Sequence, residues 1–191
     1  MDRRELLKMI VAATGAAMIG LPSLGQAQAP AASANALFSD ADVGTLDEIA
    51  ETILPRTKTP GAKDAATGVF MATFVSDCYT DRQQATFRAG LVDINQRAGG
   101  RFVSLAPQAR AELLRALDTE ARKHAVEVTE TGTAEEGEAM PHYFTMLKQL
   151  AIFGFFTSKV GATEVLKYVA VPGRYDGDLA YIPGTPAWGT S

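Results

Sequence analysis

The segment from Pro141 to Ser158 is the most apolar part of the chain outside its N-terminus, and it restricts the folds that the chain can adopt. It has eighteen residues and contains Lys148 and Gln149. A membrane-spanning helix needs about 20 consecutive apolar residues, so this segment is too short and too interrupted to span a bilayer. Its apolar side chains would cover most faces of a helix. The segment therefore predicts a central helix, buried on most sides by other helices.

The rest of the chain also shows helical periodicity. Ser39 followed by Asp42 is typical of a capped helix start, and apolar residues then recur at helical spacing until Pro55, which must end the helix. No alternating strand pattern of useful length appears. The predicted fold class is all-α, a single helical domain with an irregular tail. Further helices are predicted over 68–79, from a cap at Asp81 to Gly99-Gly100, and from near Pro107 to Ala121.

Three stretches are predicted to be irregular. Residues 55–68 carry Pro, Thr, Lys and Gly with little apolar periodicity, which indicates a loop. Residues 129–139 are acidic and contain glycine, and a solvated loop is the favoured interpretation. Residues 168–191 are rich in Pro and Gly and should form an irregular C-terminal tail after a short turn near Val165 and Leu166.

The N-terminus has the features of an export signal. Two adjacent arginines precede the apolar run Met9–Leu21, whose thirteen residues are too few to span a bilayer. The segment resembles a twin-arginine signal, which addresses a chain to a pathway that carries folded proteins. An ordinary amphipathic helix and an uncleaved signal anchor are the alternatives. The residues that form the motif are Arg3, Arg4, Leu6, Leu7 and Lys8, with Asp2 where a Ser or Thr is usual.

The signal also sets the predicted domain boundaries. Small residues around Ala27 fit a signal-peptidase site, so we expect a signal peptide over 1–27, a flexible tether over 28–36 and a helical domain over 37–191. The whole chain has 18 basic and 22 acidic residues and a net charge of −4. Removal of residues 1–27, which hold three basic and two acidic residues, makes the charge −5. This charge argues against nucleic-acid binding.

Residues for cofactor or metal chemistry are few. The chain has no G-x-G-x-x-G turn for a dinucleotide, and His124 and His142 lie apart in sequence, outside any metal-binding motif. Cys78 is the only cysteine and is predicted to be buried, with a reactive thiol or an intermolecular disulfide as the lesser alternative. Asp47 and Glu51 share a helix face, and a solvated acidic face is favoured over acid–base catalysis. We therefore predict no catalytic, cofactor-binding or metal-binding residue.

Aromatic residues provide candidates for a partner interface. Phe153, Phe155 and Phe156 are favoured as core, with an interaction surface as the alternative. The tail also carries aromatic residues, in a segment that cannot bury them around a regular helix, so partner docking and packing on the domain itself stay equally open. The tail candidates are Tyr168, Tyr175 and Trp188.

Several stretches together resemble the gluconate 2-dehydrogenase subunit 3 family. They are the signal D-R-R-E-L-L-K, residues 51–65 with the sequence E-T-I-L-P-R-T-K-T-P-G-A-K-D-A, residues 153–163 and residues 171–178. The resemblance covers most of the chain, from the signal to about Asp178, and the I-L-P-x-T-x-T-P-G-A portion is its most specific part. It adds Pro55, Thr59, Pro60 and Gly61 as candidates for the partner interface.

The resemblance implies a small, non-catalytic subunit of a periplasmic sugar or sugar-acid dehydrogenase. In such complexes a catalytic flavoprotein of the glucose-methanol-choline type holds FAD, and a cytochrome c subunit with haem c often receives the electrons. The small subunit is thought to carry the signal read by the twin-arginine translocase for the flavoprotein. The expected location is the periplasm, with membrane association through the complex. The alternatives are a stand-alone periplasmic enzyme with its own pocket near Cys78 or His142, and a docking module needed after export.

Overall fold

The computed structural model describes residues 37–131, 140–171, 173, 177–180 and 182–189. The elements in this part of the chain are all helices, which confirms the all-α prediction. None of these helices is long and apolar enough to cross a membrane. In chain order they are α2 (Asp40–Ile53), the 3-10 turn η1 (Ala62–Ala65), α3 (Thr67–Cys78), α4 (Asp81–Arg97), the 3-10 turn η2 (Phe102–Ser104), α5 (Pro107–Thr131), α6 (Tyr143–Thr157) and the π-helical turn η3 (Gly161–Val165).

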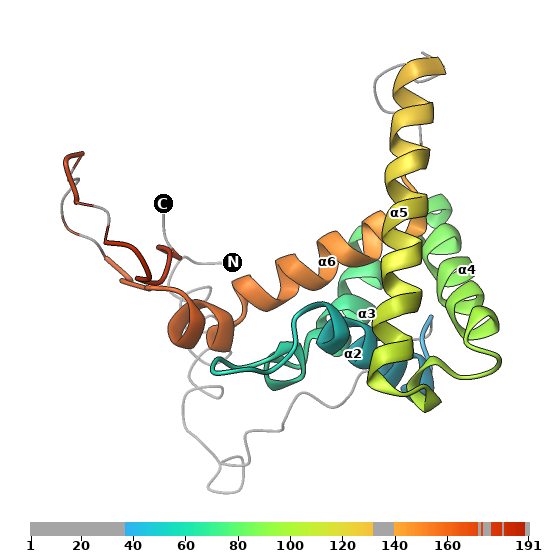
Figure 1. Ribbon diagram of the computed structural model, residues 1–191, viewed down its shortest axis with the longest axis horizontal. Coiled ribbons are helices and arrows are strands. Elements are labelled where there is room, and N and C mark those ends of the chain that lie inside the picture. Colours follow the sequence, from blue (N-terminus) through green and yellow to red (C-terminus); the bar gives the residue numbers. More distant parts are fainter. Residues whose placement is uncertain (1–36, 132–139, 172, 174–176, 181, 190–191) are drawn as a thin grey trace, which may run out of the picture. The chain divides into compact units, whose positions relative to one another are not determined.

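Helix α6 is the central element of the bundle, as its apolar sequence predicts. It contacts α2, α3, α4 and α5 as well as the short turns η1 and η3. Figure 1 shows α6 crossing beside α2 and α3, with α5 and α4 at its N-terminal end. The buried residues of α6 fall on most of its faces, because several neighbours remove it from water. They are Phe144, Met146, Leu147, Leu150, Ala151, Gly154 and Phe155.

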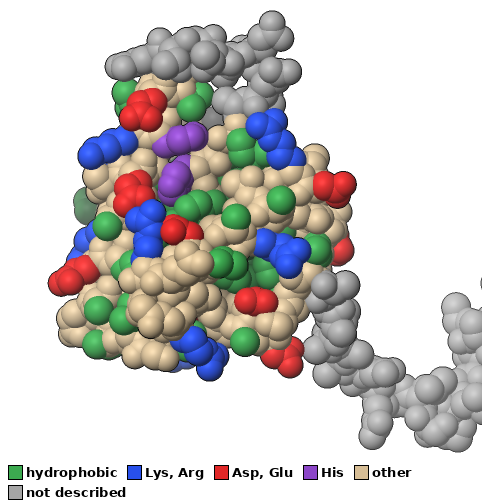
Figure 2. Space-filling model, turned by 90° about the vertical axis from the view of Figure 1, so that its right-hand side faces the viewer, with side chains coloured by type: hydrophobic (Ala, Val, Ile, Leu, Met, Phe, Trp, Pro, Cys, Tyr) green, Lys and Arg blue, Asp and Glu red, His purple; other side chains and the backbone are tan. Residues whose placement is uncertain are grey.

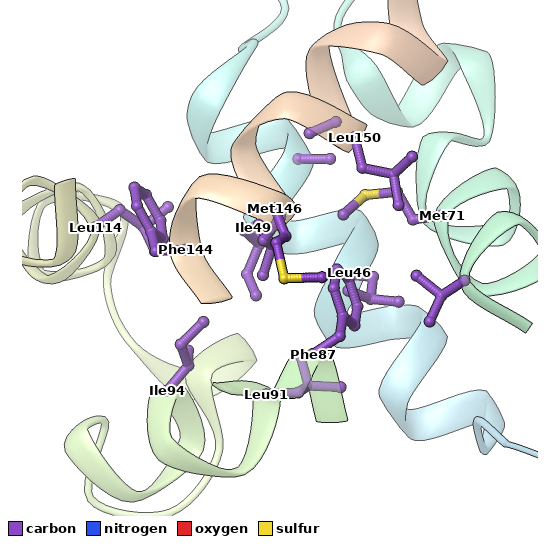
Figure 3. Close-up of a cluster of buried hydrophobic side chains, with 14 of the residues drawn as sticks. Leu46, Ile49, Met71, Phe87, Leu91, Ile94, Leu114, Phe144, Met146 and Leu150 are labelled. Atoms are coloured by element: carbon purple, nitrogen blue, oxygen red, sulfur yellow. The ribbon is translucent and has the colours of Figure 1, made fainter. Parts of the chain in front are cut away.

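One apolar core joins these helices. Leu46 and Ile49 of α2 and Phe87 of α4 are at most 1% exposed and pack with α6 (Figure 3). Full burial of one such side chain stabilises a fold by about 1.5–3 kcal/mol. Burial of these side chains therefore joins α2, α4 and α6 in one core. The other labelled core residues are Met71, Leu91, Ile94, Leu114, Phe144, Met146 and Leu150.

Two glycines allow α6 to approach its neighbours closely. A Cβ atom at Gly90 of α4 would lie 2.3 Å from the ring of Tyr143. A Cβ at Gly154 of α6 would lie 2.4 Å from the ring of Phe70 in α3. Each glycine therefore leaves space that an aromatic ring of the facing helix occupies.

The helix boundaries follow the predicted signals with small differences. Ser39 and Asp42 form the predicted capping box of α2. The cap of α4 is Thr80 and not Asp81, because the Thr80 hydroxyl and the Gln83 side chain satisfy each other's backbone N–H groups. The predicted loop over 55–68 is partly wrong, since η1 lies within it and α3 begins at Thr67. Residues 129–131 are helical, and the rest of the predicted acidic loop lies outside the described residues.

Candidate partner interface

The loop between α2 and η1, residues 55–61, is organised by one carboxylate. Glu51 in the last turn of α2 accepts the backbone N–H of Arg56 at 2.8 Å and that of Lys63 at 2.9 Å, one on each oxygen. The N–H of Ala62 donates to the carbonyl of Leu54 at 3.0 Å and closes the base of the loop. Both ends of the loop are thus bound to α2.

Gly61 is required by this arrangement. A Cβ there would lie 2.5 Å from the backbone nitrogen of Arg56 and 2.5 Å from a carboxylate oxygen of Glu51. Its N–H donates to Asp64 at 2.7 Å. Gly61 is buried, so it shapes the loop and does not present a surface to a partner.

Neighbouring carboxylates of α2 hold other parts of the fold. Asp47 accepts the N–H of Gly68 at 2.7 Å, at the start of α3. Glu48 forms ion pairs with Lys63 and with Arg110 of α5. The predicted solvated acidic face is therefore wrong for Asp47 and Glu51, which are half-buried and hydrogen-bonded to backbone groups of the next segment.

The tip of the loop is its accessible part. Pro55 and Thr59 are exposed, and Pro60 is half-buried. The N–H of Thr57 donates to the carbonyl of Thr59 at 3.0 Å, which tightens the tip. Of the predicted interface residues in this loop, Pro55 and Thr59 lie at the molecular surface.

The tail closes on itself through one backbone bridge. The N–H of Lys167 donates to the carbonyl of Ala187 at 2.8 Å, and the N–H of Gly189 donates to the carbonyl of Lys167 at 2.9 Å. The Lys167 ammonium lies 4.1 Å from the centre of the Trp188 ring, which is cation–π geometry. Lys167 and the 187–189 segment therefore lie together, although the described residues of the tail form no helix.

Several apolar side chains of the tail are exposed. Tyr168 is 47% exposed and Trp188 is 45% exposed, while Tyr175 lies outside the described residues. Exposed apolar residues that cluster in one segment are typical of interaction sites. The other exposed apolar residues of the tail are Val169, Val171, Leu179 and Ile182.

A second aromatic surface lies between α3 and α6 and includes Phe153, for which core was the favoured prediction and a surface position the alternative. Phe153 is 48% exposed, and its ring centre lies 5.8 Å from those of both Phe70 and Phe74. The core prediction is right for Phe155, which is 3% exposed, and wrong for Phe153. The two positions are about 200° apart around a helix, so one faces the core when the other faces solvent. Phe156 is half-buried.

The two histidines, which lie apart in sequence, are neighbours in space. Their ring centres are 5.8 Å apart, and Figure 2 shows them side by side on one face. They line a pocket of about 210 Å³ between α5 and the segment before α6. Partial burial, and next the charge of His124, hold the pKa of His142 below its ordinary value. The residues that line this pocket are Ala121, His124, Ala125, Val128, Met140, Pro141, His142 and Thr145.

Other predicted features can be located only in part. Cys78 is exposed at the end of α3, so the prediction that it is buried is wrong, and it does not line the histidine pocket. Within the described ranges, no three His, Cys, Asp or Glu side chains are grouped to hold a metal ion. The export-signal residues Arg3, Arg4, Leu6, Leu7 and Lys8 lie outside the described residues.

Comparison with known families identifies a matching family model. The model for gluconate 2-dehydrogenase subunit 3 matches residues 40–173, more than two thirds of the chain. This span includes the loop over 55–61 and the aromatic surface of α3 and α6, but neither the N-terminal segment nor Trp188. No curated protein and no solved structure matches the chain.

Proposed function

The chain belongs to the gluconate 2-dehydrogenase subunit 3 family, and from this premise we propose that it is the non-catalytic small subunit of a periplasmic FAD-dependent sugar or sugar-acid dehydrogenase. Its catalytic partner would be a flavoprotein of the glucose-methanol-choline type. A cytochrome c subunit would complete some of these complexes. The chain would supply the export signal for the flavoprotein and stabilise it.

The observation that carries this proposal is the family match over residues 40–173. The sequence of the N-terminus supports the escort role, because a twin-arginine signal serves chains that fold before export. A flavoprotein must acquire FAD in the cytoplasm and therefore has to cross the membrane folded. A flavoprotein without its own signal would cross while bound to this chain.

The escort role can be tested with the paired substitutions Arg3→Lys and Arg4→Lys in cells that also express the flavoprotein. We expect FAD-dependent sugar dehydrogenase activity to disappear from the periplasm and to accumulate in the cytoplasm. The matched control is Arg82→Lys with Arg101→Lys, two exposed arginines of the folded domain, which should leave export unchanged. Undiminished periplasmic activity in the signal variant would refute the escort role.

We further propose that the tail and the tip of the 55–61 loop contact the flavoprotein. Tyr168 and Trp188 are half-exposed aromatic side chains, and aromatic residues commonly anchor protein interfaces. Pro55 and Thr59 are the exposed positions of the loop that the family model covers. A chain truncated after Val171 should lose co-purification of the flavoprotein. Unchanged co-purification would count against the tail and would leave the escort test unaffected.

A stand-alone enzyme is the second candidate, and the pocket beside His124 and His142 is the observation that favours it. Imidazoles are common acid–base groups near neutral pH. The purified full chain, assayed with sugars and an artificial electron acceptor but no flavoprotein, distinguishes the two functions. Turnover by the unmodified chain that is lost in His142→Asn would favour the stand-alone enzyme. No turnover by the unmodified chain would favour the accessory subunit.

A further inference from the structure

Helix α6 begins with an unusual N-cap. The Nδ1 atom of His142 accepts the backbone N–H of Phe144 at 3.2 Å. Helices α2 and α4 use the hydroxyls of Ser39 and Thr80 for the same purpose, and hydroxyls keep their acceptor at every physiological pH. An imidazole accepts a hydrogen bond at Nδ1 only when it is neutral. The central helix therefore starts with a cap that a proton can remove.

The surroundings of His142 offer little compensation for a positive charge. Its ring stacks on that of Tyr143, with centres 4.5 Å apart, and it faces the His124 ring of α5. Among the described residues, Asp93 and Arg97 of α4 and Glu120 and His124 of α5 are the charged or titratable groups that act on it.

The carboxylates near His142 already have a partner. Arg97 Nε lies 2.8 Å from an oxygen of Asp93, and its Nη1 lies 2.7 Å from an oxygen of Glu120. Asp93 also accepts the hydroxyl of Tyr143. An imidazolium at position 142 would have to compete with Arg97 for these acids, and it would meet a second imidazole on its other side.

We propose that His142 is a pH-sensitive N-cap, which holds the first turn of α6 when neutral and releases it when protonated. A proton from solvent occupies the Nδ1 lone pair, so the hydrogen bond to Phe144 is lost and two N–H groups face each other. The cationic ring also lies at the helix N-terminus, where the helix dipole disfavours positive charge.

Release of this turn would act on the contact between α6 and α4. Tyr143 directly follows His142, and its ring fills the space beside Gly90. Its hydroxyl bonds Asp93. Loosening of the first turn would withdraw this ring from α4 and change the wall of the histidine pocket. The later turns of α6, which bury Leu150 and Phe155, would stay in place.

The direction of the pH effect follows from linkage. The folded state lowers the pKa of His142 from its ordinary value of about 6.5, so it binds fewer protons than the unfolded chain. The stabilisation is complete above pH about 6.5 and is lost as the pH falls below that value.

The decisive variant is His142→Asn in the full chain, because Asn is a strong N-cap that cannot take up the proton. Backbone hydrogen exchange at Phe144, Thr145 and Met146 would be measured at neutral and acidic pH and corrected for intrinsic rates. In the unmodified chain we expect protection of these amides to fall about fivefold at acidic pH, the typical effect of a lost cap. In His142→Asn the protection of these amides should not change with pH. The first turn of α2 is the internal control.

A second variant keeps the proposal testable if His142→Asn does not fold. His124→Gln removes the facing imidazole, so the release should shift to higher pH. The same pH response in the unmodified chain and in His142→Asn would overturn the proposal. A shift of the release to lower pH in His124→Gln would also overturn the proposal.

Discussion

The two segments proposed to contact a partner are held in very different ways. The loop over 55–61 is bound at both ends to α2 through Glu51, and Gly61 lets the chain pass close to that carboxylate. The tail is closed by the bridge between Lys167 and Trp188, with a cation–π contact beside it. The loop is therefore bound to a helix of the bundle, whereas the tail is closed on itself.

This difference separates two kinds of binding surface. A surface that the fold fixes in advance loses little conformational entropy on binding. The described tail presents exposed apolar side chains, which could add buried area to an interface. We infer that the loop tip would determine the orientation of a partner and that the tail would add contact area.

The largest expected effect concerns the loop. Gly61→Ala places a Cβ against the backbone of Arg56 and the Glu51 carboxylate, so both hydrogen bonds to Glu51 must shift. We expect a loss of about 3 kcal/mol in the free energy of unfolding, the upper range for overpacking. Urea denaturation followed by circular dichroism measures it.

Gly44→Ala is the matched control for this variant. Gly44 lies in α2, and a Cβ there meets nothing within 4 Å. Alanine should stabilise the helix by about 0.5–1 kcal/mol. Equal effects of the two substitutions would show that the loop does not depend on its contact with Glu51.

Much of the fold could be predicted because each helix carries its own signals. The capping box at Ser39 marks the start of α2 in both the sequence and the structure, and Pro55 follows shortly after its end at Ile53. The sequence predicts Asp81 as the cap of α4, one residue late, although Thr80 and Gln83 have capping-box spacing. The turn η1 was missed because a 3-10 turn of four residues is too short to show a periodicity.

The surfaces were harder to predict because they depend on which helices meet. Nothing in the sequence pairs His124 with His142, since their contact arises from the packing of α5 beside the start of α6. The exposure of Phe153 depends in the same way on where α3 lies. The solvated face predicted for Glu51 is wrong because its carboxylate, in the last turn of α2, binds backbone N–H groups of the following segment.

A smaller effect is expected when the carboxylate itself is removed. Glu51→Ala leaves the N–H groups of Arg56 and Lys63 without their acceptor. Both are near water, so we expect a loss of about 2 kcal/mol in the free energy of unfolding. Glu112→Ala, at an exposed position of α5, should change it by less than about 0.5 kcal/mol. Similar values for the two variants would contradict the role given to Glu51.

The smallest effect on global stability is expected in the tail, and a natural probe makes it measurable. Trp188 is the only tryptophan of the chain, so its fluorescence reports on the tail while circular dichroism reports on the helices. Lys167→Met removes the cation beside its ring and should change the fluorescence, with a change below about 0.5 kcal/mol in the stability of the bundle.

In urea the fluorescence transition should precede the loss of helix, because the tail is closed by one bridge outside the core. Coincident transitions would mean that the tail and the bundle unfold as one unit. The contrast between the fixed loop and the separately closed tail would then be wrong.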